Sequence, residues 1–136
     1  MEEVNEYKEM LGKTFKEVKN VDNKELIFET DDGVQYIFYH RQMGSEKVEI
    51  VEIIGNLEDL TSSPLLMAEE VIHEDDDYNV FEDENYDGYE TWTFYKFATR
   101  KGYVTVRWFG ESNGFYSEKV NFKIKDKKEK EEHNES

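Results

Sequence analysis

Cysteine is absent from this chain of 136 residues, and proline occurs once. Without cysteine, a disulfide framework, thiol catalysis and cysteine-ligated zinc are all excluded. No stretch approaches 18 consecutive apolar residues, so the sequence predicts no membrane-spanning segment. The acidic start Met1-Glu2-Glu3 has neither the basic nor the apolar region of a signal peptide, and we expect a cytoplasmic protein.

Basic residues are also scarce: 17 Lys and Arg stand against 33 Asp and Glu, which gives a formal net charge of −16. Direct binding to nucleic acid or anionic lipid would have to overcome electrostatic repulsion by this negative charge, because affinity for phosphate comes from Lys and Arg. Cations and basic protein surfaces are the natural partners, although such a charge can also serve solubility alone. We therefore expect a basic protein surface as partner, no direct nucleic-acid contact, no membrane contact, and a monomer or dimer.

The length predicts one domain, and the nine Phe, nine Tyr and two Trp supply large apolar areas for its core. Residues 1–11 are expected to form a helix packed on the domain, with Val4, Tyr7 and Leu11 on one face and Gly12 after its end. Residues 12–125 are expected to form a single β-rich domain with an acidic loop at 74–88. The mixed-charge tail, 126–136, is expected to be disordered.

Three turns ending in glycine separate segments of alternating apolar residues, and we predict a hairpin at each. The three loops would be Asp31-Asp32-Gly33, Arg100-Lys101-Gly102 and Ser112-Asn113-Gly114, each with its glycine in the left-handed conformation of a G1 bulge. A two-residue Asn-Gly loop is the usual hairpin signal, but it would turn the apolar side chains of the last hairpin to opposite faces. The predicted cross-strand pairs are Leu26–Phe38, Phe28–Tyr36, Phe94–Trp108, Ala98–Val104, Val104–Phe122 and Val106–Val120.

Further elements follow from the same patterns. Lys47–Ile54 reads as a strand, and residues 56–60 read as a short helical turn that Asn56 can cap. Residues 64–72 are open between helix and strand, with a narrow preference for strand. The fold class is therefore mainly β (α+β): an antiparallel meander of hairpins forming a curved sheet or a small sandwich or barrel, with a short N-terminal helix.

The most distinctive feature is an acidic centre, since no Lys or Arg occurs from Val48 to Tyr95. Aromatic residues alternate with the carboxylates there, and such a segment is suited to a basic protein groove, with carboxylates in place of phosphates. The common alternative is a solvated or disordered loop. The predicted partner-binding face comprises Glu69, Glu70, Glu74, Asp75, Asp76, Asp77, Tyr78, Phe81, Glu82, Asp83, Glu84, Tyr86 and Asp87.

The run from Asp83 to Gly88 matches the first half of an EF-hand loop, with oxygen ligands at positions 1, 3 and 5 and glycine at position 6. Position 12 is Phe94 instead of glutamate, and no flanking helices are predicted. The candidate metal ligands are Asp83, Asn85, Asp87 and Glu90. We expect no cofactor beyond weak Ca²⁺ binding.

No motif indicates catalysis. His40 and His73 have no metal-ligand spacing, and an ordinary polar role at a strand end is the simpler interpretation of each. The serines lie in no nucleophile elbow, and the chain has no P-loop or dinucleotide fingerprint. We therefore expect a protein that is not an enzyme.

Several collinear segments resemble an uncharacterised family of small proteins, a domain of unknown function found mainly in bacteriophages and prophages. The resemblance covers most of residues 12–122 and rests on Tyr39–Gln42, Glu46–Leu60, Ser63–Glu70, Tyr89–Lys96 and Gly102–Trp108. The family pattern has a cysteine pair just before the strand, where this chain has Gly44-Ser45. The resemblance implies a phage-borne origin and carries no established activity, so it implies no catalytic residues.

Together these observations favour a non-enzymatic acidic binding protein, phage-derived, that occupies a basic surface of a host or defence nucleic-acid-binding protein as a nucleic-acid mimic. Two alternatives remain open. One is a small β domain that binds Ca²⁺ or a small molecule, and the other is an immunity protein for a basic toxin nuclease.

Overall fold

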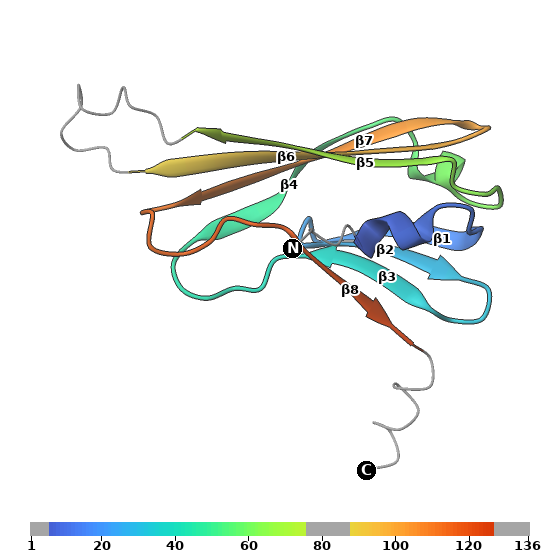
Figure 1. Ribbon diagram of the computed structural model, residues 1–136, viewed down its shortest axis with the longest axis horizontal. Helices are drawn as coiled ribbons and strands as arrows, with labels where there is room; N and C mark the ends of the chain where they lie inside the picture. The colour runs from blue at the N-terminus through green and yellow to red at the C-terminus, as the bar shows by residue number, and fades with distance from the viewer. Residues whose placement is uncertain (1–5, 76–87, 127–136) are drawn as a thin grey trace, which may run out of the picture.

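Within residues 6–75 and 88–126, which the computed structural model describes, eight strands form two four-stranded antiparallel sheets (Figure 1). The strands are β1 (Phe15–Val21), β2 (Glu25–Thr30), β3 (Gln35–Tyr39), β4 (Lys47–Ile54), β5 (Met67–Asp75), β6 (Tyr89–Thr99), β7 (Gly102–Ser112) and β8 (Asn121–Lys125). The first sheet has the order β1-β2-β3-β8 and the second has the order β4-β7-β6-β5. The predicted mainly β fold class is confirmed. Of the predicted arrangements, a curved sheet, a sandwich or a barrel, the structure has the sandwich, formed by two sheets.

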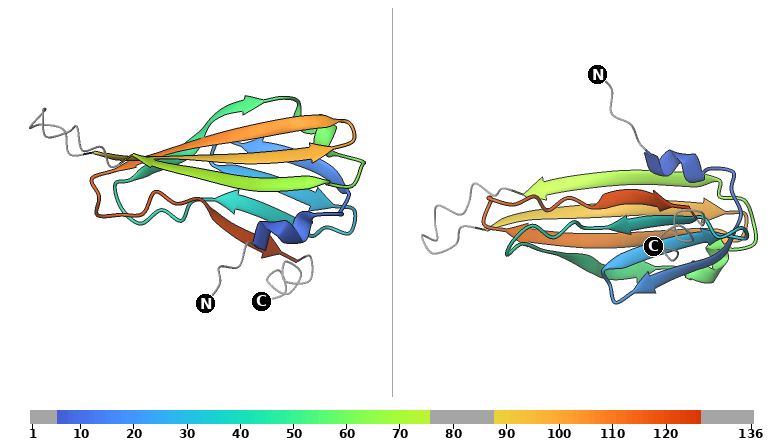
Figure 2. Two further views of the ribbon diagram at one scale, coloured as in Figure 1. Left: turned by 45° about the horizontal axis from the view of Figure 1, so that its top comes forward. Right: turned by 90° about the horizontal axis from the view of Figure 1, so that it is seen from below.

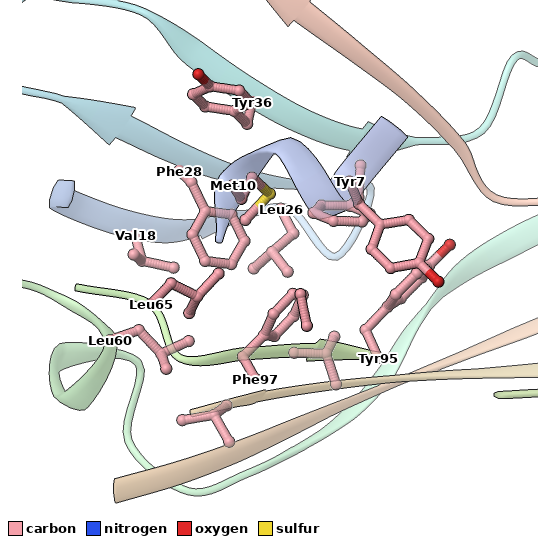
Figure 3. Packing of buried hydrophobic residues seen from close by; sticks show 14 of the residues in the cluster. Tyr7, Met10, Val18, Leu26, Phe28, Tyr36, Leu60, Leu65, Tyr95 and Phe97 are labelled. Atoms are coloured by element: carbon pink, nitrogen blue, oxygen red, sulfur yellow. The ribbon is translucent and has the colours of Figure 1, made fainter. Parts of the chain in front are cut away.

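The core lies between the two sheets and is rich in aromatic rings (Figure 3). Phe28 and Phe38 of the first sheet contact Phe97 of the second, with ring centroids 4.9 and 5.7 Å apart. Such edge-to-face pairs each add about 0.5–1.5 kcal/mol beyond the burial of their apolar area. Trp108 is also fully buried on β7. These contacts fix the two sheets against each other and so position the segments that connect them.

The hairpin between β2 and β3 has the predicted register. Leu26 pairs with Phe38 and Phe28 pairs with Tyr36. Gly33 has φ of 91°, and its amide donates to the carbonyl oxygen of Thr30 at 3.1 Å. The three-residue loop ending in a left-handed glycine is therefore confirmed here.

The hairpin between β6 and β7 is shifted by one residue from the prediction. Phe94 pairs with Arg107 and Ala98 pairs with Tyr103, so the predicted Phe94–Trp108 and Ala98–Val104 pairs are wrong. The loop has two residues, because Gly102 lies within β7 and does not have a positive φ. Gly102 serves a close approach instead: a Cβ there would lie 2.8 Å from Oδ2 of Asp59.

The third predicted hairpin does not form, and the pairs Val106–Val120 and Val104–Phe122 are wrong. β7 lies between β4 and β6, so neither of its edges is open to β8. β8 instead joins the first sheet, where Phe122 pairs with Phe38. Asn113 and Gly114 do turn the chain, with φ of 91° at Gly114, but the turn sends it across to the other sheet.

Two short 3₁₀ helices complete the described structure, η1 (Glu6–Met10) and η2 (Leu57–Leu60). η2 is the predicted helical turn, and the side chain of Asn56 caps it by accepting from the amide of Glu58. η1 covers part of the predicted N-terminal helix and buries Tyr7 and Met10, whereas Leu11 is 40% exposed, so Leu11 was wrongly placed on the buried face. No helix in the described part of the chain is long and apolar enough to cross a membrane.

The remaining strand predictions are confirmed at Lys47–Ile54 and, from Met67 onward, in the segment that was open between helix and strand. β1 was not predicted. Its hairpin with β2 turns through Asp22 and Asn23, which both have positive φ, a conformation that Asp and Asn tolerate better than most residues. The tail at 127–136 and most of the acidic loop lie outside the described residues.

Candidate functional site

A cleft of about 590 Å³ lies between the inner face of β5 and β6 and the segment that connects β7 to β8. The first sheet does not reach this end of the second sheet, and Figure 1 shows β5 and β6 extending past it. We call this feature the acidic cleft. Its lining residues are Glu70, Ile72, Glu74, Tyr89, Glu90, Thr91, Thr93, Gly114, Tyr116, Ser117, Glu118, Lys119 and Val120.

Carboxylates dominate the charge of the acidic cleft. Glu70 and Glu74 come from β5 and Glu118 from the connecting segment, whereas Glu90, which also borders the acidic cleft, shares the outward side of β6 with Trp92. Among the described residues of the lining, Lys119 is the one with a basic side chain. A concave wall that carries one sign of charge focuses the electrostatic field, so the acidic cleft attracts cations.

Glu118 is held in place by two hydroxyl groups from the second sheet. Thr91 Oγ1 donates to Glu118 Oε1 at 2.6 Å, and Ser112 Oγ donates to the other carboxylate oxygen. The connecting segment comes this close because Gly110 has no side chain: a Cβ there would lie 2.8 Å from the Cβ of Glu118. A glycine inside a strand often marks such a close backbone approach.

Glu70 is fixed by a hydrogen bond from Tyr95, a residue of the core. The hydroxyl of Tyr95, on a side chain that is 2% exposed, donates to Glu70 Oε2 at 2.6 Å. Burial raises the pKa of Tyr95 well above its usual range, and the hydrogen bond to Glu70 and the charge of Glu70 raise it further. Tyr95 therefore remains a donor at any physiological pH, and it fixes one carboxylate at the floor of the acidic cleft.

A buried hydrogen-bonded pair, His40 and Glu46, anchors the wall opposite β5. His40 Nδ1 lies 2.7 Å from the carbonyl oxygen of Lys119, and His40 Nε2 lies 2.7 Å from Glu46 Oε2. A carbonyl oxygen only accepts, so Nδ1 donates, and both ring nitrogens face acceptors. The amides of Met43 and Gly44 also donate to Glu46. His40 therefore ties the loop between β3 and β4 to the wall of the acidic cleft.

The pKa of Glu46 reflects this environment. Burial alone would raise it, but the hydrogen bonds from His40 and from the backbone amides of Met43 and Gly44 lower it to about 2. Glu46 is thus a carboxylate throughout the physiological range. Because both nitrogens of His40 are engaged, neither is available to a metal ion or a substrate, which agrees with the structural role expected for this histidine at a strand end.

The structure places the described members of the predicted acidic face on both sides of the second sheet. Glu70 and Glu74 line the acidic cleft, whereas Glu69 pairs with Lys96 on the opposite face, since successive strand residues alternate. Asp75 is the last residue of β5. The other predicted members lie outside the described residues: Asp76, Asp77, Tyr78, Phe81, Glu82, Asp83, Glu84, Tyr86 and Asp87.

Of the predicted calcium ligands, Glu90 lines the acidic cleft, and Asp83, Asn85 and Asp87 lie outside the described residues. Within residues 6–75 and 88–126, no group of three or more His, Asp and Glu side chains is placed to hold a metal ion. The calcium site stays a prediction. Sequence reasoning missed Glu118, Tyr116 and Lys119, because the predicted β7–β8 hairpin would have carried them away from β5.

The opposite, outward face of the second sheet is aromatic. Trp92 and Phe109 contact each other at 4.4 Å between ring centroids, and the guanidinium of Arg107 lies 4.9 Å from the ring of Trp92. Arg107 also forms an ion pair with Glu52 at 2.9 Å. This arginine is therefore paired and stacked, and its charge does not face the acidic cleft.

The fold and site define a two-sheet antiparallel sandwich with an acidic cleft at one end. A family model described as "Domain of unknown function (DUF7448)" matches residues 8–122, and the chain belongs to that family. The prediction that the chain belongs to an uncharacterised family is therefore confirmed. No curated protein matches the chain. No solved structure matches it either.

Proposed function

We propose that this is a non-enzymatic binding protein whose acidic cleft receives a basic segment of a protein partner. The observation that carries the proposal is the set of three carboxylates, Glu70, Glu74 and Glu118, on the two facing walls of the acidic cleft, against a single lysine. Two of them, Glu70 and Glu118, are fixed by hydroxyl donors, so the negative charge is held in position before a partner arrives. Preorganised charge of this kind favours specific over non-specific attraction.

The surrounding charge supports the same proposal. β5 ends and β6 begins at this end of the sandwich, and Asp75 pairs with Glu90 there. The sequence between them, residues 76–87, contains six carboxylates (Asp76, Asp77, Glu82, Asp83, Glu84 and Asp87) and no Lys or Arg. The net charge of −16 adds a long-range field that speeds the approach of a basic partner.

The finer part of the proposal concerns the partner. We propose a host or defence protein that binds nucleic acid, with the carboxylates standing in for phosphates, and a phage-derived protein acting in the host cytoplasm. On this proposal the protein competes with duplex DNA for the basic surface of such a partner. A competition assay with a DNA-binding protein that has a phosphate-contacting groove tests this part separately from the charge recognition itself.

The experiment for the charge recognition uses a short arginine- and lysine-rich peptide as probe. We expect calorimetry to show binding that weakens steeply as salt rises from about 50 to about 500 mM. Glu74→Gln, in the acidic cleft, should weaken it more than Glu17→Gln, an exposed carboxylate on the first sheet that changes the net charge equally. Absence of binding at low salt, or equal effects of the two variants, would contradict the proposal.

The volume of the acidic cleft favours a second candidate, a small cationic ligand. About 590 Å³ falls within the roughly 300–1,000 Å³ typical of small-molecule sites. A linear polyamine is a suitable probe, because its spaced ammonium groups match separated carboxylates. This candidate predicts a rise in Tm with polyamine that Glu74→Gln reduces, and an unchanged Tm would remove it.

A further inference from the structure

Three of the four sheet edges in the described structure carry the features by which proteins prevent edge-to-edge pairing. β1 has a register shift between Phe15 and Glu17. β4 has one between Ile50 and Glu52, and its Ile50 amide donates to the carbonyl oxygen of Asn23. β8 is five residues long and includes Lys123 and Lys125. β5, the fourth edge, differs from all three.

β5 is nine residues long and pairs with β6 in continuous register from Met67 to Asp75. Its first part is covered by η1, where Lys8 Nζ donates to the carbonyl oxygen of Ala68 at 2.9 Å. Figure 2 shows η1 beside β5, and in the described structure β5 is the end strand of its sheet, with no strand paired to its outer edge. Val71 and Ile72, which point to opposite faces, are 45% and 51% exposed.

The charge of this edge selects what can pair with it. Glu69, Glu70 and Glu74 lie on β5, and no lysine or arginine does. Two copies of this edge would bring like charges together, which opposes self-association through β5. A basic strand would instead be attracted to β5, because its charges are complementary to the glutamates there. Its backbone could also hydrogen-bond to the outer edge of β5, which no described strand occupies.

We propose that Glu69–Asp75 accepts strand addition by an extended basic segment of a partner protein. This inference rests on the proposed function and specifies how the basic segment is held. Strand addition takes affinity from backbone hydrogen bonds and specificity from alternate side chains. On the cleft side the partner meets Glu70, Ile72 and Glu74, which calls for alternate Lys or Arg. On the outward side it meets Glu69, Val71 and His73, which accommodates apolar residues.

The probe is a capped peptide of about nine residues in which lysine and valine alternate, long enough to span this edge at roughly 3.3 Å per residue. The matched control peptide has the same sequence with alternate backbone amides N-methylated. That change keeps every side chain and charge but removes the donors that a ladder needs. We expect the control peptide to bind at least about tenfold more weakly, because its strand pairing is lost.

The matched protein variants are Val71→Lys on β5 and Val51→Lys on β4, the two edges of the same sheet. The two valines are 45% and 43% exposed, and the two changes alter the net charge equally. We expect Val71→Lys to weaken binding about tenfold and Val51→Lys to change it less than about twofold. We also expect the alternate amides of Glu69–Asp75 that point away from β6 to gain protection from hydrogen exchange.

Each outcome decides the inference. If the N-methylated peptide binds as well as its parent, or if the two valine variants behave alike, strand addition is wrong while charge recognition by the acidic cleft stands. If the arginine- and lysine-rich peptide of the preceding section also fails to bind at low salt, the proposed function fails and this inference fails with it.

Discussion

The hydroxyl of Tyr95 donates to Oε2 of Glu70 at 2.6 Å and so joins the buried core to the floor of the acidic cleft. Tyr95 itself packs against Phe38 and Tyr7, with ring centroids 4.7 and 6.0 Å away, and Figure 3 shows Tyr7 and Tyr95 together at one end of the core. A residue that serves packing and carboxylate positioning at once links the stability of the fold to the geometry of the site.

Tyr95→Phe keeps the ring and removes the donor. Hydrogen bonds to charged groups contribute about 1.5–3 kcal/mol, and Glu70 is partly exposed, so we expect a loss of about 1–2 kcal/mol in the free energy of unfolding. Urea denaturation measures it. Glu70→Gln retains an acceptor for Tyr95 and should lose less. A Tyr95→Phe variant as stable as the parent would mean that the bond contributes nothing.

The raised pKa of Tyr95 also gives a prediction at alkaline pH. A group whose pKa is raised on folding contributes stability that is complete below its ordinary pKa of 10.0 and is lost as the pH rises above it. The parent should therefore lose stability above about pH 10, and Tyr95→Phe should lose less over the same range. Thermal unfolding at a series of alkaline pH values measures the difference, and parallel curves for the two proteins would contradict it.

Glu46 gives the corresponding prediction in acid. Its pKa falls from 4.5 to about 2 on folding, so its contribution is present above pH 4.5 and is lost as the pH falls towards 2. Glu46→Gln should flatten this part of the stability profile relative to the parent. The difference between the two proteins is the observable, because the many other carboxylates affect both alike. A difference that does not vary with pH would show that Glu46 is not stabilised as a carboxylate.

Gly110→Ala tests how the acidic cleft is built. The added Cβ would lie 2.8 Å from the Cβ of Glu118 and 3.2 Å from Cγ2 of Val48, so the connecting segment must move away from β7. Overpacking of this kind typically costs about 1–3 kcal/mol. We expect that loss together with altered NMR signals for Thr91 and Ser112, which donate to Glu118. Unchanged stability and unchanged signals would contradict the close approach.

The EF-hand-like spacing predicts a specific Ca²⁺ effect. If Asp83, Asn85, Asp87 and Glu90 form a site, millimolar Ca²⁺ should raise Tm relative to EDTA, because a ligand that binds only the folded state stabilises it. Asp87→Asn should reduce the rise, and Mg²⁺ at the same concentration controls for general charge screening. Equal Tm values in Ca²⁺ and EDTA would remove the calcium site.

Sequence patterns predicted the β2–β3 hairpin because one face of each strand is unambiguously apolar and Gly33 follows two polar residues. They failed by one residue at β6, where Trp92 and Phe94 on the outward face are as apolar as Tyr95 and Phe97 on the inward face. Alternation cannot choose between two such faces. The predicted register therefore depended on Gly102 as the last residue of a three-residue loop. In the structure Gly102 instead allows the close approach of Asp59. Asp59 lies 43 residues away in the chain, so no local sequence pattern contains this contact.

The acidic cleft was likewise predicted only in part from the sequence. The carboxylates of β5 that line it were predicted from composition, because no basic residue interrupts the acidic segment. Glu118 was not found, because its place depends on β4 already occupying the other edge of β7. Which strand takes an edge is decided by the whole sheet. The one local signal was Gly110, a glycine inside a strand of large residues, which marks a close backbone approach.

Chemical-shift mapping of the intact protein with the arginine- and lysine-rich peptide shows directly whether the acidic cleft is the binding site. We expect salt-sensitive shifts concentrated on the lining of the acidic cleft, at Glu70, Thr91, Thr93 and Lys119, with the first sheet unaffected at Glu17 and Lys19. Shifts spread evenly over the protein, or centred on the first sheet, would contradict it.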